Sequence, residues 1–369
     1  MSEETGRKSD GLQASEIPRP SAAAAERLRR AMPAVLAVVS ERLAVESAYA
    51  GTATSPAPTP EHLAFARGVQ SHFGATLSAI YDLGLFESLP EEAAWYVSTL
   101  AWRGLGPDAI RRMIEAWSVA IYSSIKPPEA DQLVAPLKWI KLNVERLRER
   151  EQTGDGRRTQ ELGALLALVL GKRRRDAADY LLDLARKGRS LADIHSGLIG
   201  PALTEIGLMW QQHKISAADE HAATEICRYS LFRLLDSMPR HPELHHTALV
   251  TAVPGEEHAF GAEILAGYLD LQGWQTVFLG RSAPAEDIVE AARSTGSEVV
   301  FLSVALTANL PQAVALAGAL RILPSSPRVI MGGRAAAAAA GALGRYADAV
   351  ATGLEDAHAR ALGMVTGDA

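Results

Sequence analysis

The sequence predicts three structured blocks: an all-helical domain, a four-helix bundle and a doubly wound parallel α/β sheet. Two observations carry this prediction. From residue 22 to about residue 238, apolar residues recur at helical spacing and the helices are interrupted at proline and glycine. From residue 246 onward, short apolar segments alternate with helical segments, which is the pattern of parallel strands joined by right-handed crossover helices.

The first block contains only helical patterns. Residues 1–21 are polar and charged, so we predict a disordered tail. A helix is predicted over residues 22–50, and the proline-rich stretch 51–60 cannot continue it, because proline removes a backbone donor. Pro60 marks the first turn of a new helix. We therefore predict an all-helical domain over residues 22–150, with interruptions at Pro90, 104–107 and 127–128.

A polar, glycine-containing stretch at residues 149–160 separates the first block from the second and is the predicted linker. The second block, residues 161–240, reads as helices broken near Gly171, 188–190 and 200–201. Helices of these lengths are typical of a compact four-helix bundle.

The third block, residues 245–369, changes from a helical period to alternating strands and helices. Strands are predicted at 246–253, 275–280, 298–303, 328–333 and 347–352, with helices at 260–272, 284–294, 311–323 and the C-terminus. Parallel sheets of this kind bind ligands beyond the carboxyl ends of their strands. Those ends carry residues 254–258, Ser303 and the pair Gly332 and Gly333.

Composition limits the possible functions. The net charge of −6 and the isoelectric point near 6.0 do not indicate a nucleic-acid surface. The single cysteine, Cys227, excludes a disulfide framework and a cysteine-rich metal cage. There is no secretory signal pattern and no apolar run of about 20 residues, the length needed to span a bilayer. We therefore expect a soluble, cytoplasmic protein with no membrane partner.

A histidine motif follows the first predicted strand. It reads Glu256-x-His258-x-x-Gly261, and Ser303, Leu306, Gly332 and Gly333 follow later strands. Together these residues resemble the flavodoxin-like cobalamin-binding domain. The resemblance implies that His258 is the lower axial ligand to cobalt, that Glu256 accepts a hydrogen bond from its second nitrogen, and that Ser303 and the glycines contact the buried nucleotide tail of the cofactor.

A lone histidine of this kind could also cap a helix, and glycines could simply turn the chain. Three motif elements at successive strand ends favour the cobalamin interpretation. The serine element departs from the family pattern, because Leu306 lies three residues after Ser303 and Ala305 occupies the usual leucine position. That departure concerns the contacts between this loop and the nucleotide tail of the cofactor.

A second pattern lies in the predicted bundle: Trp210, nine intervening residues, then Glu220 and His221. It resembles cobalamin photoreceptors of the light-responsive transcription-repressor type. The resemblance implies that these three residues line the pocket of an upper 5′-deoxyadenosyl group, that light breaks the cobalt–carbon bond, and that the bundle then moves. The alternative is that Trp210 is a core residue of the bundle and Glu220 a solvated one.

The pattern departs from the repressor-type relatives in one position. Those relatives carry a histidine directly after the tryptophan, which can ligate cobalt after photolysis, whereas this sequence has Gln211. His213 is the candidate replacement as a light-state ligand.

The first block lacks a basic recognition helix and is rich in aromatic residues. Its size and helix content resemble a globin-like or related sensor domain, and the order of blocks is similar to the photocobilins, which bind cobalamin and biliverdin. Because Cys227 lies outside this block, biliverdin would be bound non-covalently. Haem is the alternative chromophore, with His62 or His72 as axial ligand.

The resulting hypothesis is a light sensor, not an enzyme, that contains adenosylcobalamin and biliverdin. It would act as a homo-oligomer or through a downstream protein partner that the sequence does not identify, and without contacting nucleic acid directly. Two alternatives remain: a corrinoid protein that carries methyl groups for a methyltransferase system, and a regulator that senses cobalamin level without light.

Overall fold

The computed structural model describes residues 12–50, 60–152 and 159–367, and of these the side chains of 45–50, 60–67 and 150–152 are outside the description. The chain divides into two compact units, Met1–Gly154 and Asp155–Ala369. None of the described helices combines the length and the apolar character that a bilayer-spanning helix needs.

The first unit is helical, as predicted. Its helices are α1 (Ala22–Ala50), α2 (Pro60–Leu83), α3 (Leu89–Trp102), α4 (Pro107–Ser124), α5 (Glu129–Leu142) and α6 (Val144–Gln152). Prolines set several starts, since Pro90 lies in the first turn of α3 and Pro107 opens α4, where a missing N–H costs nothing. Leu28, Leu77 and Trp117 are among the fully buried core side chains.

The predicted disordered tail needs correction where it is described. Residues 1–11 lie outside the described residues, but residues 12–21 contain a short 3-10 turn, η1 (Ala14–Glu16), and are held against the helices. Ile17 is 3% exposed, and the Arg19 guanidinium pairs with Glu87. Burial of the Ile17 side chain offsets part of the cost of fixing the backbone of this segment.

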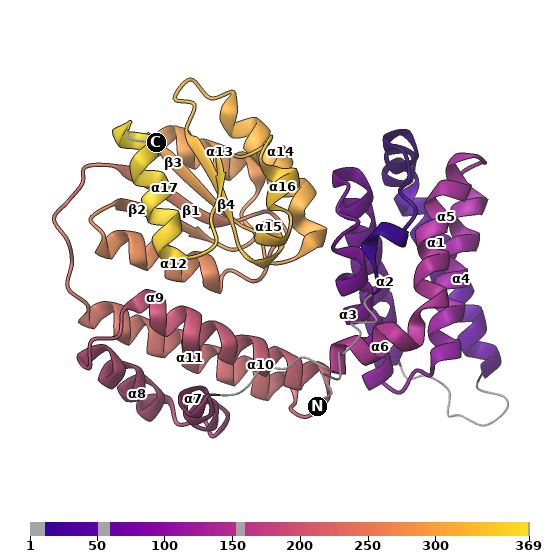
Figure 1. The fold of residues 1–369 in the computed structure, drawn as a ribbon, viewed down its shortest axis with the longest axis horizontal. Helices are drawn as coiled ribbons and strands as arrows, with labels where there is room; N and C mark the ends of the chain where they lie inside the picture. The colour runs from indigo at the N-terminus through magenta and orange to yellow at the C-terminus, as the bar shows by residue number, and fades with distance from the viewer. Residues whose placement is uncertain (1–11, 51–59, 153–158, 368–369) are drawn as a thin grey trace, which may run out of the picture. The chain divides into compact units, whose positions relative to one another are not determined.

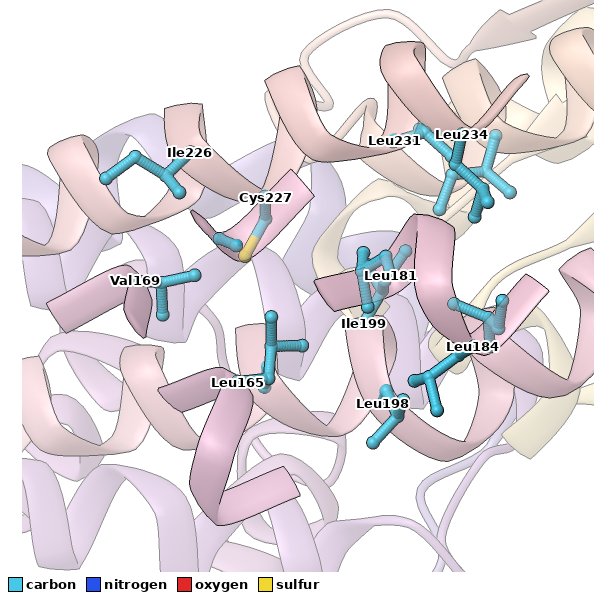
Figure 2. Packing of buried hydrophobic residues seen from close by; sticks show 14 of the residues in the cluster. Leu165, Val169, Leu181, Leu184, Leu198, Ile199, Ile226, Cys227, Leu231 and Leu234 are labelled. Carbon is cyan, nitrogen blue, oxygen red and sulfur yellow. The ribbon is translucent and has the colours of Figure 1, made fainter. Parts of the chain in front are cut away.

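The second unit begins with a helical block: α7 (Gln160–Leu170), α8 (Arg174–Arg186), α9 (Leu191–Ile194), the π-helical turn η2 (His195–Ile199), α10 (Gly200–Gln211) and α11 (Ala217–Ser237). Figure 2 shows apolar side chains from these helices packed around Cys227. Burial raises the pKa of the Cys227 thiol to about 12, so this cysteine is a core residue and not a nucleophile.

The helical block differs from the prediction at one interruption. A break was expected near residues 200–201, but the chain stays helical from Leu191 to Gln211. The Gly200 N–H donates to the carbonyl of His195, five residues back, which widens the helix by one residue in the turn before Pro201. Proline normally clashes with the preceding helical turn, and the π turn takes up that strain without ending the helix.

The third block forms the predicted parallel sheet. Its strands are β1 (Thr247–Ala252), β2 (Gln275–Gly280), β3 (Val299–Ser303), β4 (Arg328–Gly332) and β5 (Ala349–Val350), in the order β2-β1-β3-β4-β5. The connecting helices are α12 (Phe260–Leu271), α13 (Ala285–Thr295), the short η3 (Thr307–Asn309), α14 (Leu310–Arg321), α15 (Arg334–Ala338), α16 (Ala340–Leu343) and α17 (Leu354–Thr366). The doubly wound parallel sheet is therefore confirmed.

The helices cover both faces of this sheet. Helices α12 and α17 pack on one face and α13 and α14 on the other (Figure 1). Along the α12 face, Val250, Phe301 and Ile330 are register partners on neighbouring strands and form an apolar row. The next row toward the carboxyl edge is Ala252, Ser303 and Gly332. Polar and small residues therefore replace apolar ones where the strands end.

Candidate functional site

The strand order determines where a ligand can enter the sheet. Strands β1 and β3 are neighbours, but β1 leads to α12 on one face while β3 leads to α14 on the other. The two loops diverge at this switch point and leave a crevice, which is where doubly wound sheets bind ligands. The loop after β1 carries Glu256 and His258, and the loop after β3 runs from Val304 to Asn309.

Glu256 joins these two loops. Its carboxylate is fully buried and accepts hydrogen bonds from the backbone N–H groups of Ala305 and Leu306, each at 3.0 Å, and from Asn309 Nδ2 at 3.0 Å. Burial by itself raises the pKa of Glu256, but hydrogen bonds from His258, Asn309 and the backbone outweigh it and lower the pKa to about 2. Glu256 is therefore a buried carboxylate anion whose oxygens are saturated with donors.

His258 takes its orientation from Glu256. The distance from His258 Nδ1 to Glu256 Oε1 is 2.7 Å, and the His258 backbone N–H donates to the same oxygen at 3.0 Å. Because a carboxylate only accepts hydrogen bonds, Nδ1 must carry the proton. In the neutral imidazole the lone pair is then on Nε2, and 62% of the side chain is exposed. His258 thus presents a ready metal-ligand nitrogen with its other nitrogen fixed by a carboxylate.

The serine element meets Glu256 through its backbone. Ala305 and Leu306 contribute backbone N–H groups to Glu256, which any residue except proline supplies. These two hydrogen bonds do not depend on which of the two positions carries leucine. Sequence analysis missed Asn309, whose side chain is 9% exposed and donates to Glu256. Its only signal was a polar residue just beyond a strand end.

A cavity of about 250 Å³ lies between the sheet and helices α12 and α17. Four predicted site residues line it: Gly261, Ser303, Gly332 and Gly333. Its floor includes the apolar row of Val250, Phe301 and Ile330. Pockets for whole drug-sized ligands measure about 300–1,000 Å³, so this cavity suits part of a larger molecule, such as a flat base with its sugar.

The glycines at the cavity have different reasons for being glycine. Gly333 has φ +97°, and a Cβ there would lie 2.5 Å from the carbonyl oxygen of Val304, so the backbone itself requires glycine. A Cβ at Gly332 would meet nothing closer than 3.6 Å, and one at Gly261 nothing closer than 4.0 Å. Since both residues line the cavity, the absence of a side chain there leaves room for a ligand.

The residues predicted to line the pocket of the upper group lie in the helical block. Trp210 is in α10, and Glu220 and His221 are in α11. None of the three belongs to the core cluster of the block: Trp210 is partly buried, the Glu220 side chain is 24% exposed and that of His221 is 80% exposed. Trp210 is therefore not the core residue that the alternative interpretation required. Glu220 accepts a hydrogen bond from Thr224 and pairs with His221.

His213 lies in the turn between Trp210 and Glu220. It is exposed and has φ +55°, and its N–H donates to the carbonyl of Trp210 where α10 ends. Neither His213 nor the Trp210 group lines the cavity between the sheet and α12.

The first unit contains a second cavity, lined by apolar and aromatic side chains of α2 to α5 that include Phe73, Tyr96 and Trp117. Its volume is about 30 Å³, roughly the space of one water molecule in the liquid. His72 Nδ1 pairs with the Tyr96 hydroxyl, which also bonds Thr76. The side chain of His62 lies outside the described residues.

Comparisons with known proteins match the second unit to cobalamin-binding domains. Residues 246–362 match the B12 binding domain family, and residues 164–235 match a second family model, also described as a B12 binding domain. The chain therefore carries the two parts of a cobalamin-binding region, and cobalamin binding is the function that these matches support.

Similar proteins fall into two kinds. Over 160 residues the chain is 29% identical to the HTH-type transcriptional repressor CarH of Myxococcus xanthus, a match that covers 43% of this chain and 53% of CarH. Over 140 residues it is 23% identical to dimethylamine corrinoid protein 1 of Methanosarcina acetivorans, covering 37% of this chain and 66% of that protein. The chain thus spans between half and two thirds of the length of these relatives.

Among solved structures, the monomethylamine corrinoid protein of Methanosarcina barkeri aligns with 55% of this chain and 97% of its own length, at 17% identity and a TM-score of 0.48.

Proposed function

Because both parts of the second unit match B12-binding domains, we propose that this protein is a light sensor that binds adenosylcobalamin, with His258 as the lower axial ligand to cobalt. The observation that carries cobalamin binding is the buried Glu256 carboxylate, which fixes Nδ1 of the exposed His258 side chain and leaves Nε2 as the possible metal ligand, three residues before Gly261 at the cavity. In this proposal Gly261, Ser303, Gly332 and Gly333 contact the nucleotide tail, and Leu306 flanks it.

The residues present fit a corrinoid for chemical reasons. A neutral imidazole is a good ligand for cobalt, and the carboxylate behind it fixes its tautomer and ring orientation. The cavity has an apolar floor for a heteroaromatic base, and the hydroxyl residues Ser303 and Thr352 are part of its lining. When bound, adenosylcobalamin supplies a light-labile cobalt–carbon bond.

Light sensing is supported by Trp210, Glu220 and His221. Their spacing resembles that in the light-responsive repressors. CarH, to which this chain is similar, is a transcriptional repressor. The partly buried indole of Trp210, outside the core of the helical block, is suited to pack against a planar upper group. The exposed His213, in the turn after Trp210, is the proposed second cobalt ligand after illumination.

Loss of the upper group would be transmitted through α11. Arg228 of α11 donates from Nε to Glu263 of α12 at 2.8 Å, and its guanidinium lies 5.8 Å from the centre of the Phe260 ring. Helix α12 begins directly after the His258 loop. This contact couples the helical block to the cobalt ligand, so a shift of the block would change a surface used for self-association or for a downstream partner.

The first unit is proposed to be the sensor domain, globin-like or related, that binds biliverdin non-covalently. Its aromatic and apolar cavity is of the right chemical character, but a volume of about 30 Å³ requires the helices to separate before a tetrapyrrole enters. Haem, with His72 as a ligand, would have to displace the Tyr96 hydroxyl from Nδ1 or use Nε2.

A second candidate function is that of a corrinoid methyl carrier, which is favoured by the similarity to dimethylamine corrinoid protein 1. A carrier exposes the upper face to its methyltransferases and does not need Trp210. A cobalamin-level regulator would respond identically in darkness and light.

The test is absorption spectroscopy of the purified chain with adenosylcobalamin, with and without biliverdin, in darkness and after green light. We expect a bound-cobalamin spectrum in the dark that His258→Ala alters, a light-driven spectral change, and a protein-bound bilin band in the red. Trp210→Ala should weaken the preference for adenosylcobalamin over methylcobalamin.

Each outcome has a distinct consequence. Cobalamin binding without any light-driven change would overturn light sensing and leave the carrier or the level regulator. Trp210→Ala separates the light sensor from the carrier, because a carrier should tolerate the substitution. The absence of a bilin band would overturn the role of the first unit alone. Binding that is unaffected by His258→Ala would overturn the assignment of the cobalt ligand.

A further inference from the structure

The π turn His195–Ile199 brings a residue of the helical block to the cavity of the sheet. Among the described residues that line this cavity, His195 is the one that the helical block supplies; the others come from the sheet and from the loops and helices of the third block. Short π segments inside α-helices are often found at functional sites, because the extra residue turns a side chain away from its regular helical position.

The position of His195 is fixed by the packing around it. Ile194, Leu198 and Ile199 are at most 1% exposed, and they belong to the same apolar cluster as Ile264 of α12 and Leu354 of α17. Leu354 directly follows Gly353, which lines the cavity. The π turn is thus part of an apolar contact between the helical block and α12 and α17, the two helices that cover the cavity.

The chemistry of His195 complements that of the cavity. Burial lowers the pKa of His195, so at neutral pH the imidazole is uncharged and offers one donor and one acceptor on a flat ring. The other polar side chains of the lining are Ser303, Thr352 and Arg334, and the floor is apolar. A heteroaromatic base attached to a sugar combines the flat apolar face and the polar edge that this lining matches.

From this arrangement we infer that His195 is a specificity-determining residue for the nucleotide tail of the corrinoid, which it contacts from the helical block when the tail occupies the cavity. The inference rests on the cobalamin binding proposed above and adds a contact between the tail and the block. Seating of the tail would therefore stabilise the position of the helical block as well as the bond from His258.

The experiment compares two corrinoids in the dark by equilibrium titration: adenosylcobalamin, and adenosylcobinamide, which has the same ring and upper group but no nucleotide. We expect His195→Ala to weaken adenosylcobalamin binding about 10-fold, the order of one lost hydrogen bond plus packing, and to leave adenosylcobinamide binding unchanged. His195→Gln, which keeps a donor and an acceptor, should restore most of the affinity.

The matched control is Ser196→Ala on the same turn, whose exposed hydroxyl bonds only its own helix and which should bind both corrinoids like the wild type. The thermal unfolding midpoint of each cofactor-free variant gives a readout of folding that does not depend on cofactor. Suppose that His195→Ala folds like the wild type. If it then weakens the binding of both corrinoids equally, or of neither, the proposed role of His195 is wrong.

This outcome is distinguishable from failure of the proposed function. A wild-type chain that binds neither corrinoid would overturn cobalamin binding and the role of His195 with it. A wild-type chain that binds cobalamin but does not respond to light, while His195→Ala selectively loses adenosylcobalamin, would support the role of His195 and overturn only light sensing.

Discussion

Glu256 is the residue on which the loops of the site depend. It is buried as an anion, and its donors come from its own loop and from the loop after β3, including Asn309 more than 50 positions along the chain. A buried carboxylate is stable only while its oxygens accept hydrogen bonds. Removal of one donor therefore leaves an oxygen of Glu256 with an unsatisfied acceptor position, which is unfavourable in free energy. Residues that look secondary in the sequence therefore control the orientation of His258.

Substitution of Asn309 tests this dependence. Asn309→Ala removes the Nδ2 donor to Glu256, and we expect cobalamin affinity to fall about 10-fold, the lower end of the effect of losing a residue that orients a metal ligand. Asn309→Asp should be worse, because it sets a second carboxylate against Glu256. The control is Gln312→Ala on the exposed side of α14, which should titrate like the wild type. Equal affinity of Asn309→Ala and the control would contradict the orienting role.

The neighbouring glycines allow a matched pair of substitutions. Gly333→Ala forces a Cβ to 2.5 Å from the Val304 carbonyl at φ +97°, and we expect the free energy of unfolding to fall by about 1–3 kcal/mol or more. Gly332→Ala meets no atom closer than 3.6 Å, so the fold should tolerate it while the added methyl reduces the space for the nucleotide tail. Chemical denaturation and cobalamin titration of both variants separate the two effects. A stable Gly333→Ala variant would be incompatible with the backbone argument.

At the scale of secondary structure, α11 has a capping box that can be tested by mutation and pH. Ser216 Oγ accepts from the Asp219 N–H at 3.1 Å, and Asp219 Oδ2 accepts from the Ser216 N–H at 3.3 Å. Ser216→Ala should lower the free energy of unfolding by about 1 kcal/mol at neutral pH. Urea denaturation measures this change in stability. The control is Ser294→Ala, near the C-terminal end of helix α13.

The same box predicts a dependence on acid. The hydrogen bond from Ser216, followed by the pairing with Lys172, lowers the pKa of Asp219 from 3.8 to about 2. A carboxyl whose pKa is lower in the folded state stabilises the fold above its unfolded value, and this contribution is lost as the pH falls toward the folded value. The stability difference between the wild type and Asp219→Asn should therefore be constant above about pH 4.5 and shrink as the pH falls through about 2. A difference as large at about pH 2 as at about pH 5 would contradict the assignment.

The π turn before Pro201 shows the limit of local rules for an element. A glycine followed by proline normally marks an interruption, and the sequence gives no sign that the helix continues. The helix persists because Leu198 and Ile199 are buried against neighbours from other elements. Tertiary burial offset the local cost of proline, and the same turn placed His195 at the cavity.

For the whole molecule, the division into two units leads to a separable prediction. The cavity, His258 and the Trp210 group all belong to Asp155–Ala369. We expect a chain of residues 155–369 to bind adenosylcobalamin and to change its spectrum in light as the full chain does, but to give no bilin band. The fragment with His258→Ala is the control. A fragment that folds, by circular dichroism, yet does not bind adenosylcobalamin would show that the first unit takes part in cobalamin binding.

The sequence by itself determined the elements and the central motif. Helical spacing predicted α1 within its observed bounds, Pro60 marked a helix start, and the alternation after residue 246 predicted each strand of the sheet to within a few residues. The pairing of Glu256 with His258, two positions apart in one loop, was expected from the resemblance to the cobalamin-binding domain. These features depend on local periodicity, turn chemistry and short-range spacing, which are properties of the sequence.

Tertiary structure decided what lies around that motif. Asn309 reaches Glu256 only because β1 and β3 are neighbours in the sheet, and His195 reaches the cavity only because the helical block packs on α12 and α17. The ordering of residues 12–21 depends likewise on burial of Ile17 among the helices of the first unit. Each of these contacts joins residues far apart in the chain, and its free energy comes from burial and hydrogen bonds that local sequence patterns do not encode.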